Sequence, residues 1–142
     1  MVKNAEEEAL LVAEEFHKAM TTRDLDGLMK LYREDAVLES SAVLTLERKT
    51  PGILRGKKDI RPHFDSFFKL AGKDNPSWLH YNPVFTNDGR LVCEYPSKGP
   101  AGESQLDVVE SFNIKNGLIA EHRVYWGYVG FEILLGPKGS YF

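Results

Sequence analysis

Two tight turns in the second half of the sequence constrain its fold more than any other feature. Asn-Gly and Asp-Gly pairs accept the backbone angles of hairpin turns, and the runs around them are rich in the β-branched and aromatic residues of strands. We therefore expect a meander of four consecutive antiparallel strands. The turns are Asn87-Asp88-Gly89, between residues 78–85 and 91–95, and Lys115-Asn116-Gly117, between residues 106–114 and 118–126.

The first half of the sequence has helical periodicity instead. Residues 5–22 repeat apolar side chains at three- and four-residue steps, which predicts a helix with one apolar stripe. Asp24 can cap a second helix that buries Tyr32 and ends near residues 34–35. A third helix is expected over residues 58–70.

Residues 36–44 form a strand-like run between the second and third predicted helices. Consecutive strands with helices grouped on one side give an α+β architecture. We expect a strongly curved antiparallel sheet wrapped around about three N-terminal helices, with one apolar pocket on its concave face. No linker or repeat interrupts the chain, so residues 1–142 are expected to form one domain, with 127–142 as a C-terminal tail.

Composition argues against several classes of function. The formal net charge is −3 and no basic stripe is visible, so nucleic-acid binding is not expected. The single cysteine, Cys93, allows neither an internal disulfide nor a cysteine-built zinc site, and no two histidines have metal-ligand spacing on a helix. No metal or cofactor is therefore expected. The absence of a long apolar run or a signal-peptide pattern favours a cytoplasmic protein without a membrane span.

Three parts of the sequence resemble the nuclear-transport-factor-2-like superfamily, in its SnoaL-like branch. They are residues 23–37, residues 54–60, and residues 108–126, which hold the closing hairpin. The resemblance implies a cone-shaped fold around an apolar pocket, and it adds to the expectation of a homodimer through the open convex face of the sheet. Relatives in this superfamily include ketosteroid isomerase, polyketide cyclases, limonene-epoxide hydrolase, scytalone dehydratase and non-catalytic association domains, so the fold does not determine the function.

The resemblance also argues against ketosteroid-isomerase chemistry. That enzyme uses a tyrosine, a carboxylate base and a protonated aspartate. The matching positions hold Phe16, Ser40 and, at the aspartate position, Val108 or its neighbour, depending on the length of the preceding turn. A phenyl ring has no donor, a serine is not a base at neutral pH, and a valine has neither role. The epoxide-hydrolase set of two aspartates and an arginine has no clear counterpart, although Asp107 and Arg123 keep it open.

Glu110 and His122 are the candidate catalytic residues. Strand alternation puts Glu110 on one face with Val108 and Phe112, and the resemblance turns that face and the one carrying His122 toward the pocket. A carboxylate in apolar surroundings has a raised pKa and a nearby imidazole stabilises its charge, so such a pair can transfer a proton. The alternative is a pair of cross-strand neighbours on a solvated rim or a dimer face.

The expected pocket lining follows from the same alternation and resemblance. It consists of Phe16, Leu38, Ser40, Val108, Phe112, Val124 and Trp126. Glu94 is expected to face outward, because Leu91, Cys93 and Tyr95 make the better apolar face. Of the other histidines, His17 is expected at the surface, and His80 could join the pocket or a partner chain.

Three functions stay open from the sequence. The chain could be a cofactor-independent isomerase, cyclase, dehydratase or hydrolase that moves a proton on a small apolar substrate. It could instead be a binding module for an apolar ligand, or a dimerisation domain whose pocket is vestigial. The tail, rich in apolar residues and glycine, is expected to cover the pocket mouth or a second subunit.

Overall fold

The computed structural model describes residues 4–70, 82–95 and 108–128. Four helices and six strands lie within these ranges. The strand residues predicted at 78–81 and 106–107, and the tail from residue 129 onward, lie outside the described residues. No helix in the described ranges has the length and apolar composition needed to cross a membrane.

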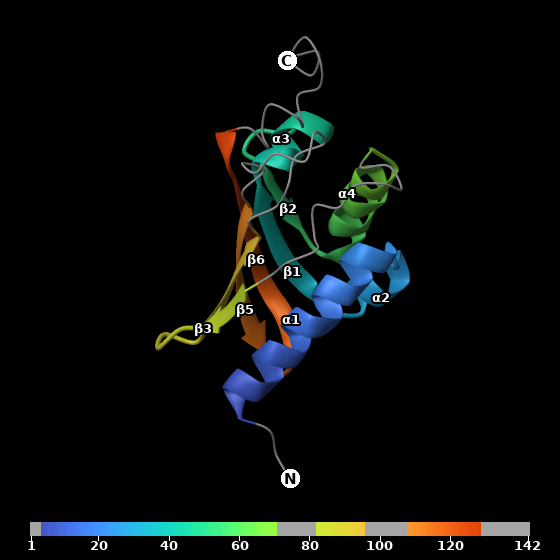
Figure 1. Cartoon of the computed structure of the whole chain (residues 1–142). Coiled ribbons are helices and arrows are strands. Elements are labelled where there is room, and N and C mark those ends of the chain that lie inside the picture. The colour runs from blue at the N-terminus through green and yellow to red at the C-terminus, as the bar shows by residue number, and fades with distance from the viewer. Residues whose placement is uncertain (1–3, 71–81, 96–107, 129–142) are drawn as a thin grey trace.

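The six strands form one curved, unclosed sheet with the order β2-β1-β6-β5-β4-β3 (Figure 1). The predicted meander of β3 to β6 is confirmed, because each of these strands pairs antiparallel with the next. Asn116 and Gly117 in the second turn have φ angles of 53° and 74°. The strands are β1 (Tyr32–Ser40), β2 (Ile53–Arg55), β3 (Asn82–Phe85), β4 (Arg90–Tyr95), β5 (Val108–Lys115) and β6 (Leu118–Trp126).

Helix α1 (Ala5–Thr22) has the predicted bounds. The Asn4 side chain accepts a hydrogen bond from Glu7 N at 2.8 Å and so caps the helix. The first turn carries three glutamates, whose negative charge is stabilised by the positive end of the helix dipole. The predicted apolar stripe is buried against the sheet, with Phe16 at its centre and only 1 % exposed.

The segment after α1 differs from the prediction. Helix α2 (Leu25–Met29) is capped by Asp24 as expected, but it ends before Tyr32. Tyr32 begins β1, because Leu31 O accepts a hydrogen bond from Ile119 N at 2.7 Å and draws the chain into the sheet. Strand β1 then runs parallel to β6, a pairing that the sequence did not indicate. Distant backbone partners here override the local helical pattern.

The predicted strand at residues 36–44 is wrong in its second part. The chain leaves the sheet after Ser40 and forms the short helix α3 (Ser41–Leu46), whose first turn is capped by the Ser40 side chain. Serine favours this position because its hydroxyl accepts from free amides at a helix start. Strand β2, also not predicted, follows and pairs antiparallel with β1.

Helix α4 (Lys57–Leu70) confirms the third predicted helix. It contacts β1 and β2, while α1 contacts β3 and β4. Helices α1, α2 and α4 lie on one side of the sheet, with α3 near one end (Figure 1). This arrangement is the α+β cone that we expected, and the core lies between the concave sheet face and these helices.

Candidate functional site

The inward face of the closing hairpin carries two ionisable side chains. Glu110 is buried between Val108 and Phe112 on β5, and His122 is buried on β6. The antiparallel register sets Phe112 opposite His122 and Glu110 opposite Val124. Glu110 and His122 are therefore diagonal neighbours on the same face, close enough for long side chains to meet.

These two side chains belong to a buried chain of three. His122 Nε2 lies 3.0 Å from Glu110 Oε1, and His122 Nδ1 lies 2.7 Å from Tyr32 Oη. Exposure is 2 % for Glu110, 0 % for His122 and 1 % for Tyr32. A solvated rim or a dimer face would leave these groups accessible in a single chain. The burial therefore contradicts both alternatives to an interior pair.

One placement of protons satisfies this chain of hydrogen bonds. The Tyr32 hydroxyl donates to Nδ1 of His122, and the Nε2–H group of the same ring donates to Oε1 of Glu110. In the reverse arrangement, an Nδ1–H group of His122 would donate the hydrogen bond and Tyr32 Oη would accept it. The hydroxyl proton would then need a second acceptor, and the described residues give Tyr32 no other hydrogen bond. We assign the first placement on this ground.

Aromatic rings enclose the imidazole of His122. Phe112 stacks on it with ring centroids 4.3 Å apart and an interplanar angle of 16°, and Phe64 of α4 stacks at 6.4 Å and 7°. Phe16 of α1 meets it edge-on at 5.4 Å. With its faces stacked and both nitrogens engaged, His122 has no free polar atom for a ligand.

The charge of Glu110 reaches several neighbouring groups. Burial first, and then the nearby Glu110 carboxylate, raise the pKa of the Tyr32 hydroxyl well above its usual value. The same two causes raise the pKa of Tyr95, and they raise the pKa of Cys93 to about 12. Tyr32, Tyr95 and Cys93 therefore stay protonated at neutral pH, and Cys93 fits the small buried residue that we predicted rather than a nucleophile.

The model of the SnoaL-like domain matches residues 13–122. The chain belongs to the SnoaL-like family. No functionally curated protein sequence matches it. Among solved structures, this SnoaL-like chain is similar to a SnoaL-like protein of unknown function from Burkholderia thailandensis, with a TM-score of 0.66 and 15% identity over 89% of this chain and 99% of that one.

Two further solved structures share the fold at low identity. A protein named as a candidate isomerase from Bacillus subtilis matches with a TM-score of 0.65 and 20% identity, over 94% of this chain and 96% of that one. SalBIII is an epoxide hydrolase/cyclase-like enzyme in pyran ring formation of the polyether salinomycin. It matches with a TM-score of 0.59 and 17% identity, over 87% of this chain and 94% of that one. At these identities the likeness establishes the fold alone.

The predicted lining residues of this SnoaL-like chain divide into two groups. Phe16, Phe112 and Leu38 surround His122, since Leu38 lies beside it in the β1–β6 register. Val108 pairs with Trp126 farther along the hairpin. Ser40 and Val124 border a cleft of about 200 Å³ where β1 and β6 meet α3.

Ser40 has a structural role in addition. Its hydroxyl accepts a hydrogen bond from Ala42 N at 3.1 Å and caps α3, and its exposure is 5 %. Phe16 packs edge-on against Phe112 at 5.0 Å, and Val108 is buried. The positions that matched the isomerase residues are thus occupied by a helix cap and two core side chains.

The remaining polar candidates lie apart from this chain of hydrogen bonds. Glu94 is exposed, which confirms its predicted outward direction. His17, predicted at the surface, is half-buried and stacks on Tyr95 at 6.5 Å. His63 is buried beside Glu47, 3.3 Å away. His80 lies outside the described residues, and within the described ranges no three His, Cys, Asp or Glu side chains gather as metal ligands would.

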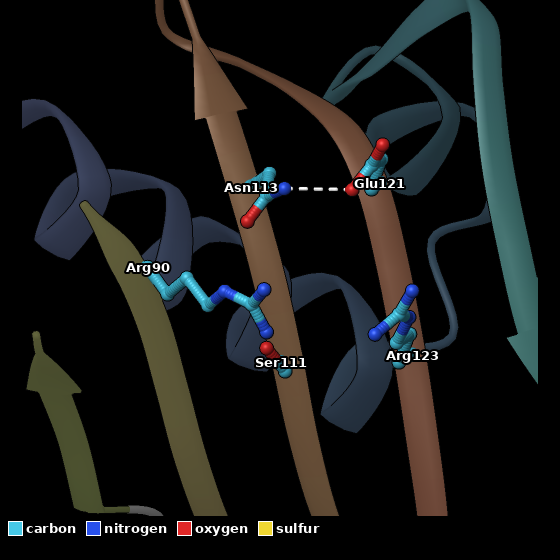
Figure 2. Close-up of a pocket in the computed structure, with 5 residues that line it drawn as sticks. All are labelled: Arg90, Ser111, Asn113, Glu121 and Arg123. Atoms are coloured by element: carbon cyan, nitrogen blue, oxygen red, sulfur yellow. Dashed lines mark hydrogen bonds between the residues drawn. The ribbon is translucent and has the colours of Figure 1, made fainter. Parts of the chain in front are cut away.

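A group of polar side chains lies on the outward face of β4, β5 and β6. Figure 2 shows the Arg90 side chain extending toward Ser111, Asn113 donating to Glu121 at 2.6 Å, and Arg123 beside them. The depression between these side chains holds only about 10 Å³, less room than a small organic ligand needs. The homodimer expected through this face stays a prediction.

Sequence reasoning missed Tyr32 because it assigned this residue to the second helix. A signal was present: Tyr32 stands three residues before Asp35-Ala36 within the first family-like segment. Its partner His122 is 90 positions away, a distance that local patterns do not cover.

Proposed function

We propose that this SnoaL-like protein is a cofactor-independent proton-transfer enzyme for a small, largely apolar substrate, with Glu110 as the catalytic base or acid. The buried hydrogen-bond chain from Tyr32 through His122 to Glu110 is the observation that carries this proposal. Ionisable side chains that are buried beside a specific charge partner are more often functional than ionisable side chains at the surface.

The proposed roles follow from which atoms are free. Oε1 of Glu110 accepts a hydrogen bond from the Nε2–H group of His122. Oε2 is buried and has no hydrogen-bond partner among the described residues. Oε2 is therefore the oxygen that would take a proton from the substrate. His122 would orient the carboxylate, and Tyr32 would hold His122 in its Nε2–H form. We propose both as positioning residues rather than as groups that touch the substrate.

The reaction class is proposed more broadly than the residues. Transfer of one proton to and from carbon or oxygen serves isomerases, cyclases, dehydratases and hydrolases alike. The likeness to a candidate isomerase and to an epoxide hydrolase/cyclase-like enzyme supports this range. The cytoplasmic location predicted from the sequence stays a prediction.

Hydrogen–deuterium exchange on an enolisable ketone tests the proposal directly. The protein is incubated with 2-tetralone in deuterium oxide, and loss of the α-proton signals is followed by NMR. We expect exchange above the buffer rate, and a decrease of at least about a hundredfold with Glu110→Gln, which keeps the shape of the side chain but removes the base. Glu94→Gln, an exposed carboxylate on the neighbouring strand, is the matched control.

Equal exchange rates for the wild type and Glu110→Gln would contradict the assignment of Glu110. Saturable binding of the ketone without any exchange would favour the second candidate, a non-catalytic binding module. The occupied isomerase positions support that candidate, because Ser40 serves as a helix cap and Phe16 and Val108 as core residues.

A further inference from the structure

The cleft of about 200 Å³ where β1 and β6 meet α3 is not part of the buried hydrogen-bond chain. It forms because the two strands diverge at this point. The parallel pairing of β1 with β6 ends at Ser40 and Val124, after which β1 gives way to α3 while β6 continues to Trp126. The last residues of β6 therefore lack β1 as a neighbour, and residues of α3 line the gap instead.

Close backbone packing fixes the α3 side of this cleft. The Ser40 side chain accepts a hydrogen bond from Ala42 N at 3.1 Å and starts α3, and Ser40 N donates to Gly52 O at 3.0 Å. A Cβ atom at Gly52 would lie 2.5 Å from Ser40 O and 3.1 Å from Cγ of Leu44. Only glycine permits this approach, so the fold itself holds Leu44 at the cleft.

An ion pair lines the cleft on the strand side. The β1–β6 register sets Glu39 opposite Arg123, and Arg123 Nε lies 3.3 Å from Glu39 Oε2. Arg123 lies on the same outward face of the sheet as Arg90 and Ser111 (Figure 2). Glu110 lies on the inward face, because alternate residues of a strand point to opposite sides. The ion pair is therefore separate from the proposed catalytic carboxylate.

This ion pair leaves both donors and an acceptor for another molecule. Among the described residues, Arg123 and Glu39 form no hydrogen bond or ion pair apart from the contact between Nε and Oε2. Arginine carries further N–H groups on its two Nη atoms, and Oε1 of the glutamate can accept. The side chains are 46% and 54% exposed, so these groups are accessible from the cleft and from solvent.

The rest of the lining offers apolar surface of suitable size. Tyr125 is 53% exposed and borders the cleft together with Leu44 and Val124. A protein cavity of about 150 Å³ is enough to hold benzene. A cleft of about 200 Å³ thus has room for one six-membered ring, which can pack against the Tyr125 ring.

We propose that this cleft binds a planar ring that carries a carboxamide or lactam group. The amide N–H group donates to Glu39, the amide oxygen accepts from Arg123, and the ring packs between Tyr125 and Leu44. The site is distinct from the Glu110 site, so this inference goes beyond the proposed function and does not depend on it.

Other polar groups fit the ion pair less well. A carboxylate attracted to Arg123 would also meet the negative charge of Glu39, 3.3 Å from the guanidinium nitrogen. An ammonium group attracted to Glu39 would meet the positive charge of Arg123. A neutral amide donates and accepts at adjacent atoms, so it satisfies both side chains without separating them.

The test compares three one-ring compounds at pH 7: benzamide, benzoate and benzylamine, which is then cationic. Each is titrated into the ¹⁵N-labelled wild-type protein and followed by NMR. We expect benzamide to shift the backbone amide signals of residues 39, 44 and 125 in a saturable manner. Its Kd should be on the order of a millimolar, as for a ligand of this size, and at least about fivefold lower than those of the two ions.

A single substitution should reverse this preference. Glu39→Gln keeps the shape of the side chain but leaves the charge of Arg123 unpaired, so affinity for benzoate relative to benzamide should rise by at least about tenfold. Arg123→Met should weaken benzamide binding by at least about fivefold. Arg33→Met is the matched control, because it breaks an exposed pair with Asp35, at 2.9 Å, elsewhere on β1 and should change neither ratio.

Several results would overturn this site. They are equal affinities for the three compounds, no saturable binding of benzamide, or an unchanged preference in Glu39→Gln. Absence of benzamide binding together with a doubled mass by light scattering would make a second copy of the chain the occupant of this face.

Failure of this inference is distinguishable from failure of the proposed function. Glu110→Gln should bind benzamide like the wild type, although it should lose exchange on 2-tetralone. Exchange that depends on Glu110 without benzamide binding would leave proton transfer standing and remove the cleft site, and the opposite pair of results would do the reverse.

Discussion

The hydrogen bond between Tyr32 and His122 offers a quantitative test of the interior. Tyr32→Phe removes one hydroxyl and keeps the ring, so the packing around Phe64, 6.0 Å away, changes little. Nδ1 of His122, fully buried, would lose its donor at 2.7 Å. An unpaired buried acceptor costs about 1–3 kcal/mol, and we expect the free energy of unfolding to fall by that amount.

The loss is large enough to measure by two methods. For a chain of this size it corresponds to a decrease in Tm of roughly 3–10 °C. Urea unfolding should show a lower midpoint with an unchanged m value, since the surface exposed on unfolding is the same. Tyr125→Phe makes the same chemical change at an exposed site and should cost less than about 0.5 kcal/mol.

A double-mutant cycle then asks whether the three residues act as one network. Tyr32 and Glu110 contact opposite nitrogens of His122, so Tyr32→Phe and Glu110→Gln should be non-additive by about 0.5–3 kcal/mol. If Tyr32→Phe costs no more than Tyr125→Phe, or if the two changes simply add, the reasoning about a coupled buried chain is wrong.

Three further predictions rest on single side chains. Burial mainly, partly opposed by Glu47 and assisted by His122, lowers the pKa of His63 from its ordinary value of 6.5. The buried neutral imidazole therefore contributes to the stability of the folded protein above that pH, and this contribution is lost as the pH falls below it. In urea unfolding between pH 7.5 and 5, the free energy of unfolding should depend less steeply on pH for His63→Gln than for the wild type. Cys93, with its pKa raised to about 12, should not react with iodoacetamide at pH 8 unless denaturant unfolds the chain, and fast labelling of the folded protein would contradict its burial. Gly117→Ala places a side chain at a φ of 74° and should lower the free energy of unfolding by about 1–2 kcal/mol, whereas an unchanged Tm would mean that the turn adjusts.

Part of the candidate site could be read from the sequence. The alternation of the closing hairpin is a local property, and it correctly set Glu110 and His122 on the inward face of adjacent strands. Alternation alone does not say which hydrogen bonds form. Tyr32 engages Nδ1 of His122, while Nε2 of the same ring is engaged by Oε1 of Glu110.

The division between sequence and structure follows the range of the forces involved. Helix α1, the turn at Asn116-Gly117 and the order of the meander were determined by the sequence, because apolar periodicity, capping and turn chemistry act over a few residues. Only the tertiary structure decided that the chain from Tyr32 becomes a strand, because the partner of that strand is β6, almost ninety residues later. The same parallel pairing brings Tyr32 to His122 and completes the buried hydrogen-bond chain, since a backbone partner from a distant strand outweighs the modest helix preference of the local sequence.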